Sequence, residues 1–125
     1  MTDERGGAGR LGERLAAQYL ESHGYRVVER NYRCRMGEID LVVEGPDSLV
    51  FVEVRTKRQP CLYRPEETIS SAKARRVVAL AEHYLAGSGQ EERPWRVDVV
   101  AVELNQQGTA VRINHFPDAI SDMVP

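Results

Sequence analysis

The stretch from Gly37 to Arg58 constrains the fold of this chain more than any other segment. Its sequence, GEIDLVVEGPDSLVFVEVRTKR, contains two runs rich in β-branched and aliphatic residues. The residues from Gly45 to Ser48 separate these runs and are typical of a tight turn. We therefore predict two neighbouring antiparallel strands, and expect the rest of the chain to be organised around them.

The alternation of side chains along each strand separates the charged residues from the apolar ones. Asp40 is predicted to share a face with Glu38, and Glu53 to share a face with Arg55 and Lys57. The apolar residues of the two strands take the opposite face: Ile39, Leu41, Val43, Val52 and Val54. Acids on such apolar strands are costly to bury unless they are paired or bound to a cation, so these acids are the main indication of function.

The composition bounds the class of protein. A chain of 125 residues is one domain, and its 17 Lys and Arg against 19 Asp and Glu give no overall basic charge. Basic residues nevertheless gather in one part of the chain: Arg55, Lys57, Arg58, Arg64, Lys73, Arg75 and Arg76. A basic surface beside acidic strands suits a phosphate-rich substrate, the alternative being a solvated face with loose ion pairs.

The remaining elements complete an α/β fold. Helices are predicted at 10–23 and 71–86, with a loop at 59–68. The second strand of the pair already described spans 48–56, and further strands are predicted at 25–33, 95–103 and 110–115. The first three strands should form an antiparallel meander, and the second helix should cross over to a central Val-rich strand. We expect a mixed sheet of about five strands flanked by two main helices. This single domain spans 10–116, between a flexible lead-in at 1–9 and a weakly structured tail at 117–125.

Three helical residues stand out from the predicted apolar stripes. Gly12 lies in the first stripe, where a missing side chain lets a helix approach a sheet closely. Glu13 lies at the edge of that stripe and can lean toward the sheet, or be an ordinary first-turn glutamate. Lys73 interrupts the second stripe in the first turn, where a cation opposes the helix dipole. Either an anion lies close to Lys73, or its charge reaches outward to water.

Several other polar residues have structural interpretations. Asp98 lies in the predicted central strand and needs a partner, such as Arg96 or a backbone donor. The histidines are scattered and are predicted to be surface residues: His23, His83 and His115. Cys34 and Cys61 are not spaced as zinc ligands, and as free thiols they suit a reducing cytoplasm. With no apolar run of spanning length and no signal-peptide pattern, we expect a cytoplasmic protein without membrane contact.

Asp40 and Glu53 are the candidate metal ligands. Two carboxylates held on adjacent strands can bind Mg²⁺ or Mn²⁺, which take oxygen ligands. The carbonyl oxygen of Val54 and water molecules can complete the coordination, and Glu13 can add a third carboxylate. Arg55, two residues after Glu53, projects from the same face and can hold an attacking water or a phosphate.

The order of these residues resembles the PD-(D/E)xK nuclease superfamily. The ordered motifs are similar to those of the YraN family, small bacterial proteins that are predicted to be endonuclease-like. They are GExxAxxYL at 12–20, NYR at 31–33, GEIDLV at 37–42, FVEVR at 51–55, Lys73, and RVDVVAV at 96–102. The resemblance covers the chain from Gly12 to about Phe116. It implies a restriction-endonuclease-like core similar to that of archaeal Holliday junction resolvases.

The resemblance also implies an active site at Glu13, Asp40, Glu53 and the position of Arg55. The superfamily has a lysine at that last position. Because arginine stays charged and cannot act as a general base at neutral pH, a lysine from elsewhere must reach the site if water activation needs one. Lys73 is the better candidate, ahead of Lys57.

Three functions are compatible with the sequence. The first is a Mg²⁺-dependent nuclease that cuts DNA, including branched DNA, and the second is a non-catalytic module that binds nucleic acid or a partner protein. The third is a small interaction domain with structural ion pairs, which the motifs make the weakest. The residues predicted to contact nucleic acid are Arg33, Lys57, Arg58, Tyr63 and Arg64. The resolvase resemblance adds a homodimer as a further expectation.

Overall fold

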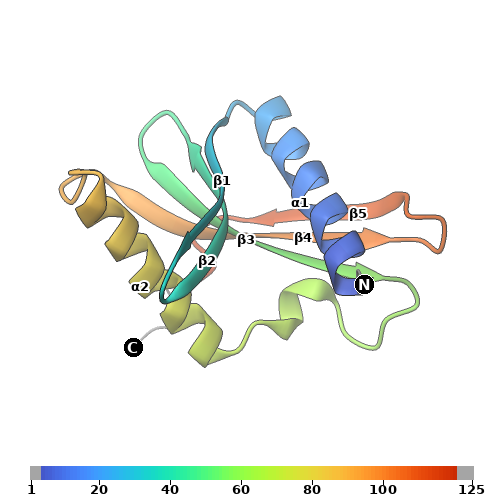
Figure 1. The fold of residues 1–125 in the computed structure, drawn as a ribbon. Helices are drawn as coiled ribbons and strands as arrows, with labels where there is room; N and C mark the ends of the chain where they lie inside the picture. Colours follow the sequence, from blue (N-terminus) through green and yellow to red (C-terminus); the bar gives the residue numbers. More distant parts are fainter. Residues whose placement is uncertain (1–3, 121–125) are drawn as a thin grey trace.

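A computed structural model of the chain describes residues 4–120 (Figure 1). Its helices are α1 (Glu4–Ser22) and α2 (Ser71–Gly87), with a short 3₁₀ helix, η1 (Pro65–Thr68). Its strands are β1 (Arg26–Cys34), β2 (Gly37–Glu44), β3 (Leu49–Arg58), β4 (Trp95–Leu104) and β5 (Ala110–Phe116). Each predicted strand and both predicted helices are present, which confirms the expected α/β class.

The strands form one mixed sheet in the order β1-β2-β3-β4-β5. β1, β2 and β3 pair antiparallel as the predicted meander, and β4 pairs parallel to β3 after the α2 crossover. β5 returns antiparallel along β4 and forms the far edge. This arrangement is consistent with the restriction-endonuclease-like core that the sequence predicts.

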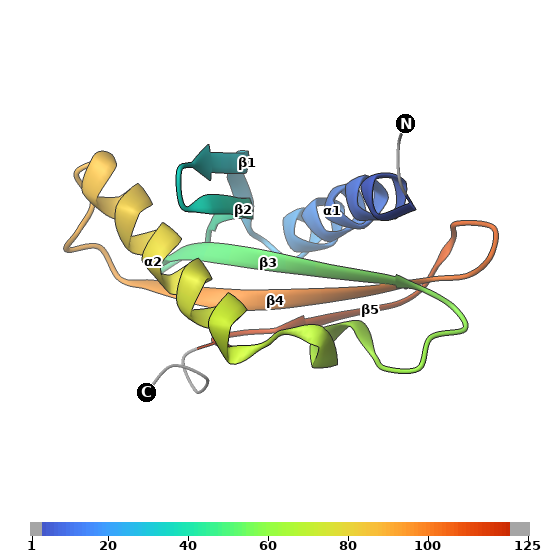
Figure 2. The ribbon, with the colours of Figure 1, turned by 60° about the horizontal axis from the view of Figure 1, so that its bottom comes forward.

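The sheet separates two apolar clusters, one beneath each helix. Val50, Val52 and Val54 of β3 pack with α1, whereas Phe51, between them in the chain, packs with α2. In Figure 2, α1 lies above the long strands β3 to β5, and α2 crosses in front of β3 and β4. β3 is therefore buried on both faces, and a charged side chain on it must find partners within the protein.

Local chemistry explains how the helices begin and how closely they pack. The Ser70 side chain accepts a hydrogen bond from the Lys73 backbone N–H at 3.1 Å, as expected of an N-cap. Gly12 packs so tightly on β3 that a β-carbon there would lie 1.9 Å from the Thr56 Oγ1 atom. The predicted close approach of the first helix to the sheet is therefore confirmed.

The boundaries of the domain differ from the prediction at both ends. α1 begins at Glu4, so residues 4–9 of the predicted lead-in are helical, because extending an existing helix costs little per residue. The side chain of Ile120 is fully buried in the cluster beneath α2, so the start of the predicted tail belongs to the core. The rest of that tail, 121–125, and residues 1–3 lie outside the described residues.

At one position of the β1–β2 ladder, the side chains of both strands switch to the opposite face of the sheet. Tyr32 pairs with Ile39, which places Asn31 opposite Asp40 at the next position. Ile39 and Tyr32 pack in the cluster beneath α2, whereas Leu41 packs beneath α1. The predicted alternation, which put Ile39 and Leu41 on one face, is therefore wrong at Asp40. Asn31 has a left-handed backbone with φ 53°, which supplies the bend in β1 that accompanies this reversal.

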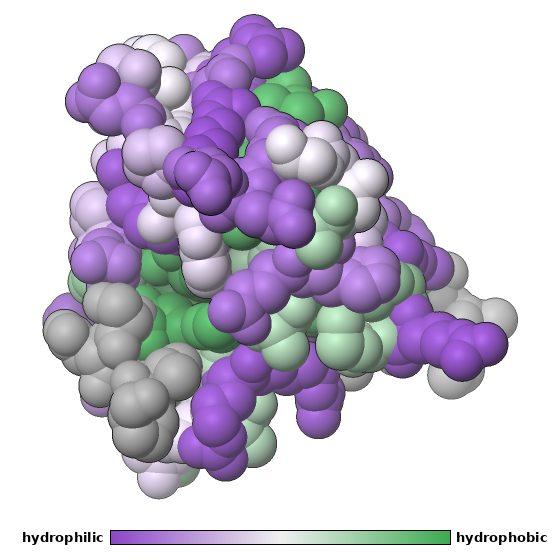
Figure 3. Space-filling model, turned by 90° about the vertical axis from the view of Figure 1, so that its left-hand side faces the viewer, coloured by the Kyte–Doolittle hydropathy of each residue, from purple (hydrophilic) through white to green (hydrophobic). Residues whose placement is uncertain are grey.

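The surface carries no broad apolar face where it is visible in Figure 3, since hydrophilic residues cover most of that side. Among the described residues, the exposed large hydrophobic side chains are Val28, Met36, Leu62, Tyr63 and Val111. None of the helices within 4–120 combines the length and the hydropathy needed to cross a lipid bilayer.

Candidate active site at the end of the β2–β3 ladder

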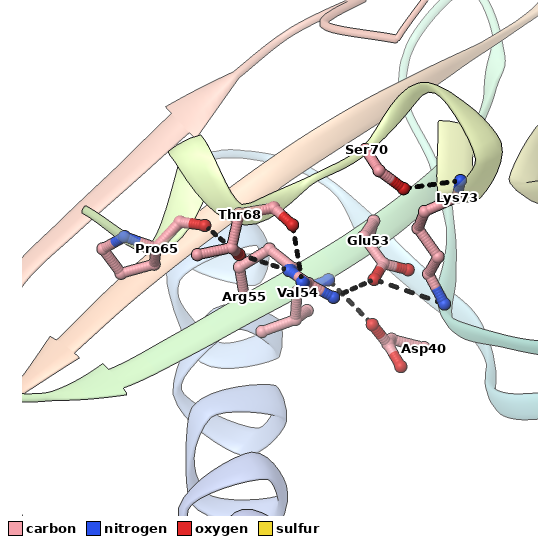
Figure 4. Close-up of polar contacts among 8 residues, drawn as sticks. All are labelled: Asp40, Glu53, Val54, Arg55, Pro65, Thr68, Ser70 and Lys73. Carbon is pink, nitrogen blue, oxygen red and sulfur yellow. Dashed lines mark hydrogen bonds and ion pairs between the residues drawn. The ribbon is translucent and has the colours of Figure 1, made fainter. Parts of the chain in front are cut away.

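Asp40 lies where β2 and β3 stop pairing. Their last described pair on this side is Leu41 with Val52. One residue beyond it, the Asp40 carboxylate accepts a hydrogen bond from the Val54 backbone N–H at 2.8 Å (Figure 4). The carboxylate thus replaces the strand carbonyl that would otherwise satisfy this donor. Since the N–H and C=O of a strand residue point to the same neighbour, the Val54 carbonyl is also directed toward Asp40.

Among the three candidate acids Glu13, Asp40 and Glu53, Glu53 is the most deeply buried, with 3% of its surface exposed. Its Oε2 atom lies 3.2 Å from Nη1 of Arg55 and 3.7 Å from Nζ of Lys73. Of the two interpretations of Lys73, the structure supports the one with an anion nearby. The cation early in α2 is stabilised by a carboxylate of the sheet, and Figure 4 shows both cations converging on Glu53.

Arg55 also connects β3 to η1. Its Nε donates to the Thr68 hydroxyl at 3.0 Å and its Nη2 to the Thr68 carbonyl at 3.1 Å. The Thr68 hydroxyl in turn donates to the carbonyl of Pro65 at 2.6 Å. The planar guanidinium therefore joins a buried acid to the end of the 59–68 loop through three separate nitrogen atoms, a spread of donors that one ammonium lacks. This bridge gives Arg55 a structural role on β3.

The carboxylates of the site affect one another electrostatically. Burial first, and then the negative charges of Glu53 and Glu13, raise the pKa of Asp40 to about 8, while the hydrogen bond from the Val54 N–H opposes the shift. Burial also raises the pKa of Glu53, and the charges of Lys73 and Arg55 partly offset that shift. In Figure 4 the side chains of Asp40 and Glu53 lie close together, and a positive charge between them would stabilise their ionised forms.

Glu13 reaches the same site from α1, on the other side of the sheet. Its Oε1 atom accepts a hydrogen bond from Nδ2 of Asn31 at 2.9 Å. Glu13 also contributes to the raised pKa of Asp40, so the predicted lean toward the sheet is confirmed. Sequence reasoning gave Asn31 no role. The available signal was an asparagine inside a predicted strand, because asparagine tolerates a left-handed backbone.

The carboxylates of this site can be compared with the oxygen ligands that a divalent ion such as Mg²⁺ requires. Within 4–120, no three or more His, Cys, Asp and Glu side chains are arranged to hold a metal together. Mg²⁺ commonly takes only one or two carboxylates, with water and substrate oxygens completing its shell. Asp40 and Glu53 supply that minimum, and their mutual repulsion is what a cation would relieve. The residues therefore fit such an ion, provided that it displaces the Lys73 ammonium from Glu53.

The residues predicted to contact nucleic acid divide into two groups. Tyr63 is 62% exposed, and Arg64 and Lys57 are exposed as well. Arg33, also exposed, lies 3.5 Å from a carboxylate oxygen of Glu38. Arg58 instead donates to the carbonyl of Asn105 at 3.3 Å and holds the β4–β5 turn. A structural role for Arg58 explains its position better than the predicted contact with substrate.

Asp98 belongs to a separate network near the C-terminal end of α1. It is fully buried and bonded to Arg96 at 2.9 Å, to Nε2 of His115 at 2.6 Å and to the backbone N–H of Asp118 at 2.8 Å. The predicted Arg96 and backbone partners are confirmed. The expectation that His115 is a surface residue is wrong, because this partly buried side chain pairs with Asp98. Cys34 and Cys61 are both free thiols, as predicted.

Comparison with known proteins identifies the family. Residues 12–102 match the model of the uncharacterised protein family UPF0102. A UPF0102 protein of Roseiflexus castenholzii is 42% identical over 98% of this chain and 99% of its own. One of Pelotomaculum thermopropionicum is 43% identical over 95% of this chain and 99% of its own.

A more distant likeness exists among solved structures. Pyrococcus furiosus SfsA in complex with Ca²⁺ aligns with a TM-score of 0.45 at 14% identity, over 87% of this chain and 63% of SfsA. This chain therefore spans less than two thirds of SfsA, and nothing about activity follows from so distant a likeness. The matches in sequence are decisive, and in agreement with the predicted YraN resemblance the chain belongs to the UPF0102 family.

Proposed function

We propose that this protein is a divalent-metal-dependent nuclease that hydrolyses DNA phosphodiester bonds, including those of branched DNA. One observation carries the proposal: the side chains of Asp40 and Glu53 lie close together where a strand ladder ends, with a lysine beside Glu53 (Figure 4). Bound Mg²⁺ or Mn²⁺ would lower the pKa of a bound water and neutralise charge on the phosphate. Asp40, Glu53 and the Val54 carbonyl would hold the ion, with Glu13 as a third acid.

Lys73 is assigned to the substrate phosphate and its attacking water. Its only described ionic partner is Glu53 at 3.7 Å, longer than an ordinary hydrogen bond, so the ammonium can turn to a phosphate oxygen. Arg55, in contrast, is held by both Thr68 and Glu53. Arg55 therefore keeps Glu53 and the loop in place, while Lys73 takes the role of the superfamily lysine. The exposed Tyr63 and Arg64 lie on that loop and would contact the DNA.

A second function is favoured by one specific observation. Arg55 and Lys73 both lie beside Glu53, as structural ion pairs would. A module that binds nucleic acid without cutting it would need nothing further from this site. The two free thiols support a cytoplasmic location for either function.

Nicking assays distinguish the two functions. Wild type, Asp40→Asn and Asp47→Asn would be incubated with linear, flap and junction DNA in Mg²⁺ or Mn²⁺, and binding would be measured in parallel. Asp47 is an exposed acid of the β2–β3 turn, so it is the matched control. The nuclease proposal expects nicking by wild type and Asp47→Asn only. Nicking that survives Asp40→Asn excludes this site, and DNA binding without nicking favours the second function.

A further inference from the structure

Asn31 has three features that no role in β1 alone explains. It is a non-glycine residue with φ 53° inside a strand, a conformation that is rare for residues with a side chain. It lies opposite Asp40 in the β1–β2 ladder, at the position where both strands change face. Its side-chain amide donates to Glu13 Oε1 at 2.9 Å. One residue thus connects β1, β2 and α1 at the candidate site.

The left-handed backbone of Asn31 and its amide hydrogen bond to Glu13 both act on the arrangement of Asp40 and Glu13. The reversal at Asn31 and Asp40 accompanies the turn of the Asp40 side chain out of regular alternation, toward the Val54 N–H. The amide of Asn31 then fixes the carboxylate of Glu13, which comes from the far side of the sheet and repels Asp40. Without a donor, a glutamate at this half-buried position would turn away from a second acid and toward water.

We propose that Asn31 is a positioning residue of the candidate site, which holds the Glu13 carboxylate beside Asp40. This inference rests on the proposed function, because it assigns Glu13 to the metal side of the site. Residues that orient metal ligands through hydrogen bonds typically contribute 10–100-fold to metal affinity or activity. We expect an effect of about that size for Asn31.

The test is a double-mutant cycle with wild type, Asn31→Gly, Glu13→Ala and the double variant. Glycine accepts the positive φ and removes only the amide, so Asn31→Gly keeps the backbone bend. Mn²⁺ affinity, nicking rate and the Tm of the metal-free protein would be measured for all four. The change in chain entropy on introducing glycine is the same in both backgrounds and cancels in the cycle.

The proposal expects Asn31→Gly to weaken Mn²⁺ binding and slow nicking about 10–100-fold in the wild-type background, with no further loss in Glu13→Ala. Equal losses in both backgrounds would show that Asn31 acts only through the backbone and would overturn the proposal. If wild type neither binds Mn²⁺ nor nicks DNA, the proposed nuclease function fails, and the cycle is read from Tm alone. Non-additive Tm shifts then support the Asn31–Glu13 contact, and additive shifts exclude it.

Discussion

Replacing Asp40 by asparagine should make the metal-free protein more stable at alkaline pH, although it removes a proposed metal ligand. In the folded protein the pKa of Asp40 is raised to about 8, above its ordinary value of 3.8. Between these values the folded state binds more protons than the unfolded state. Stability therefore falls as the pH rises through this window, and the loss is complete above the folded pKa.

The size of the effect follows from the size of the shift. One pKa unit corresponds to about 1.4 kcal/mol, so the full shift sets a ceiling of roughly 5–6 kcal/mol. Asp40 keeps part of its surface in water, which screens its charge and reduces the expected penalty to about 2–3 kcal/mol. Asparagine carries no charge to desolvate, and its side-chain oxygen can still accept the Val54 N–H.

Urea denaturation of wild type, Asp40→Asn and the control Asp47→Asn, at pH 5, 7 and 9 in EDTA, measures this difference. We expect wild type and the control to lose about 1.5–2 kcal/mol more than Asp40→Asn between pH 5 and pH 9, because part of the window from 3.8 to about 8 lies below pH 5. The remaining titratable groups are shared by the three proteins, so the comparison isolates Asp40 together with its coupling to Glu53 and Glu13. Parallel pH profiles for all three would refute the electrostatic account of the site.

Three further substitutions probe other contacts. Lys73→Met should tighten Mn²⁺ binding in calorimetry, because no ammonium then competes for the Glu53 carboxylate, and it should slow nicking. Weaker Mn²⁺ binding would contradict the role assigned to Lys73. Gly12→Ala should destabilise the protein by about 1–3 kcal/mol in urea titrations, since the new methyl group overlaps Thr56, and a neutral effect would contradict the close packing. Arg55→Lys should speed limited proteolysis of the 59–68 loop, because lysine lacks the three separate nitrogen donors that bond Thr68 and Glu53; unchanged cleavage would argue against the bridge.

The sequence predicts the sheet and the part of the site made by Glu53, Arg55 and Lys73, because those features depend on local patterns. The Val-rich run at 97–102 favours a strand buried on both faces, and prolines and glycines mark the turns between elements. Glu53 and Arg55 lie on one strand, so regular alternation places them correctly. Lys73 is predictable because a cation early in a helix needs an anion.

The remaining part of the site depends on a tertiary irregularity. The reversal at Asp40 interrupts an alternation that the sequence pattern presents as regular, so the face of Ile39 is wrongly predicted. Asn31 and Glu13 are brought together by the packing of α1 on the sheet, which no local pattern specifies. The pairing of His115 with Asp98 likewise connects two strands and becomes visible only in the folded chain.

The proposed function rests on a divalent ion held between Asp40 and Glu53. Crystals soaked in Mn²⁺ and measured at the manganese absorption edge would locate such an ion directly. The account predicts one anomalous peak with carboxylate oxygens of both residues within about 2–2.5 Å, and the ammonium of Lys73 displaced from Glu53. Lys73 still paired with Glu53 at saturating Mn²⁺, with no peak between the two acids, would contradict it.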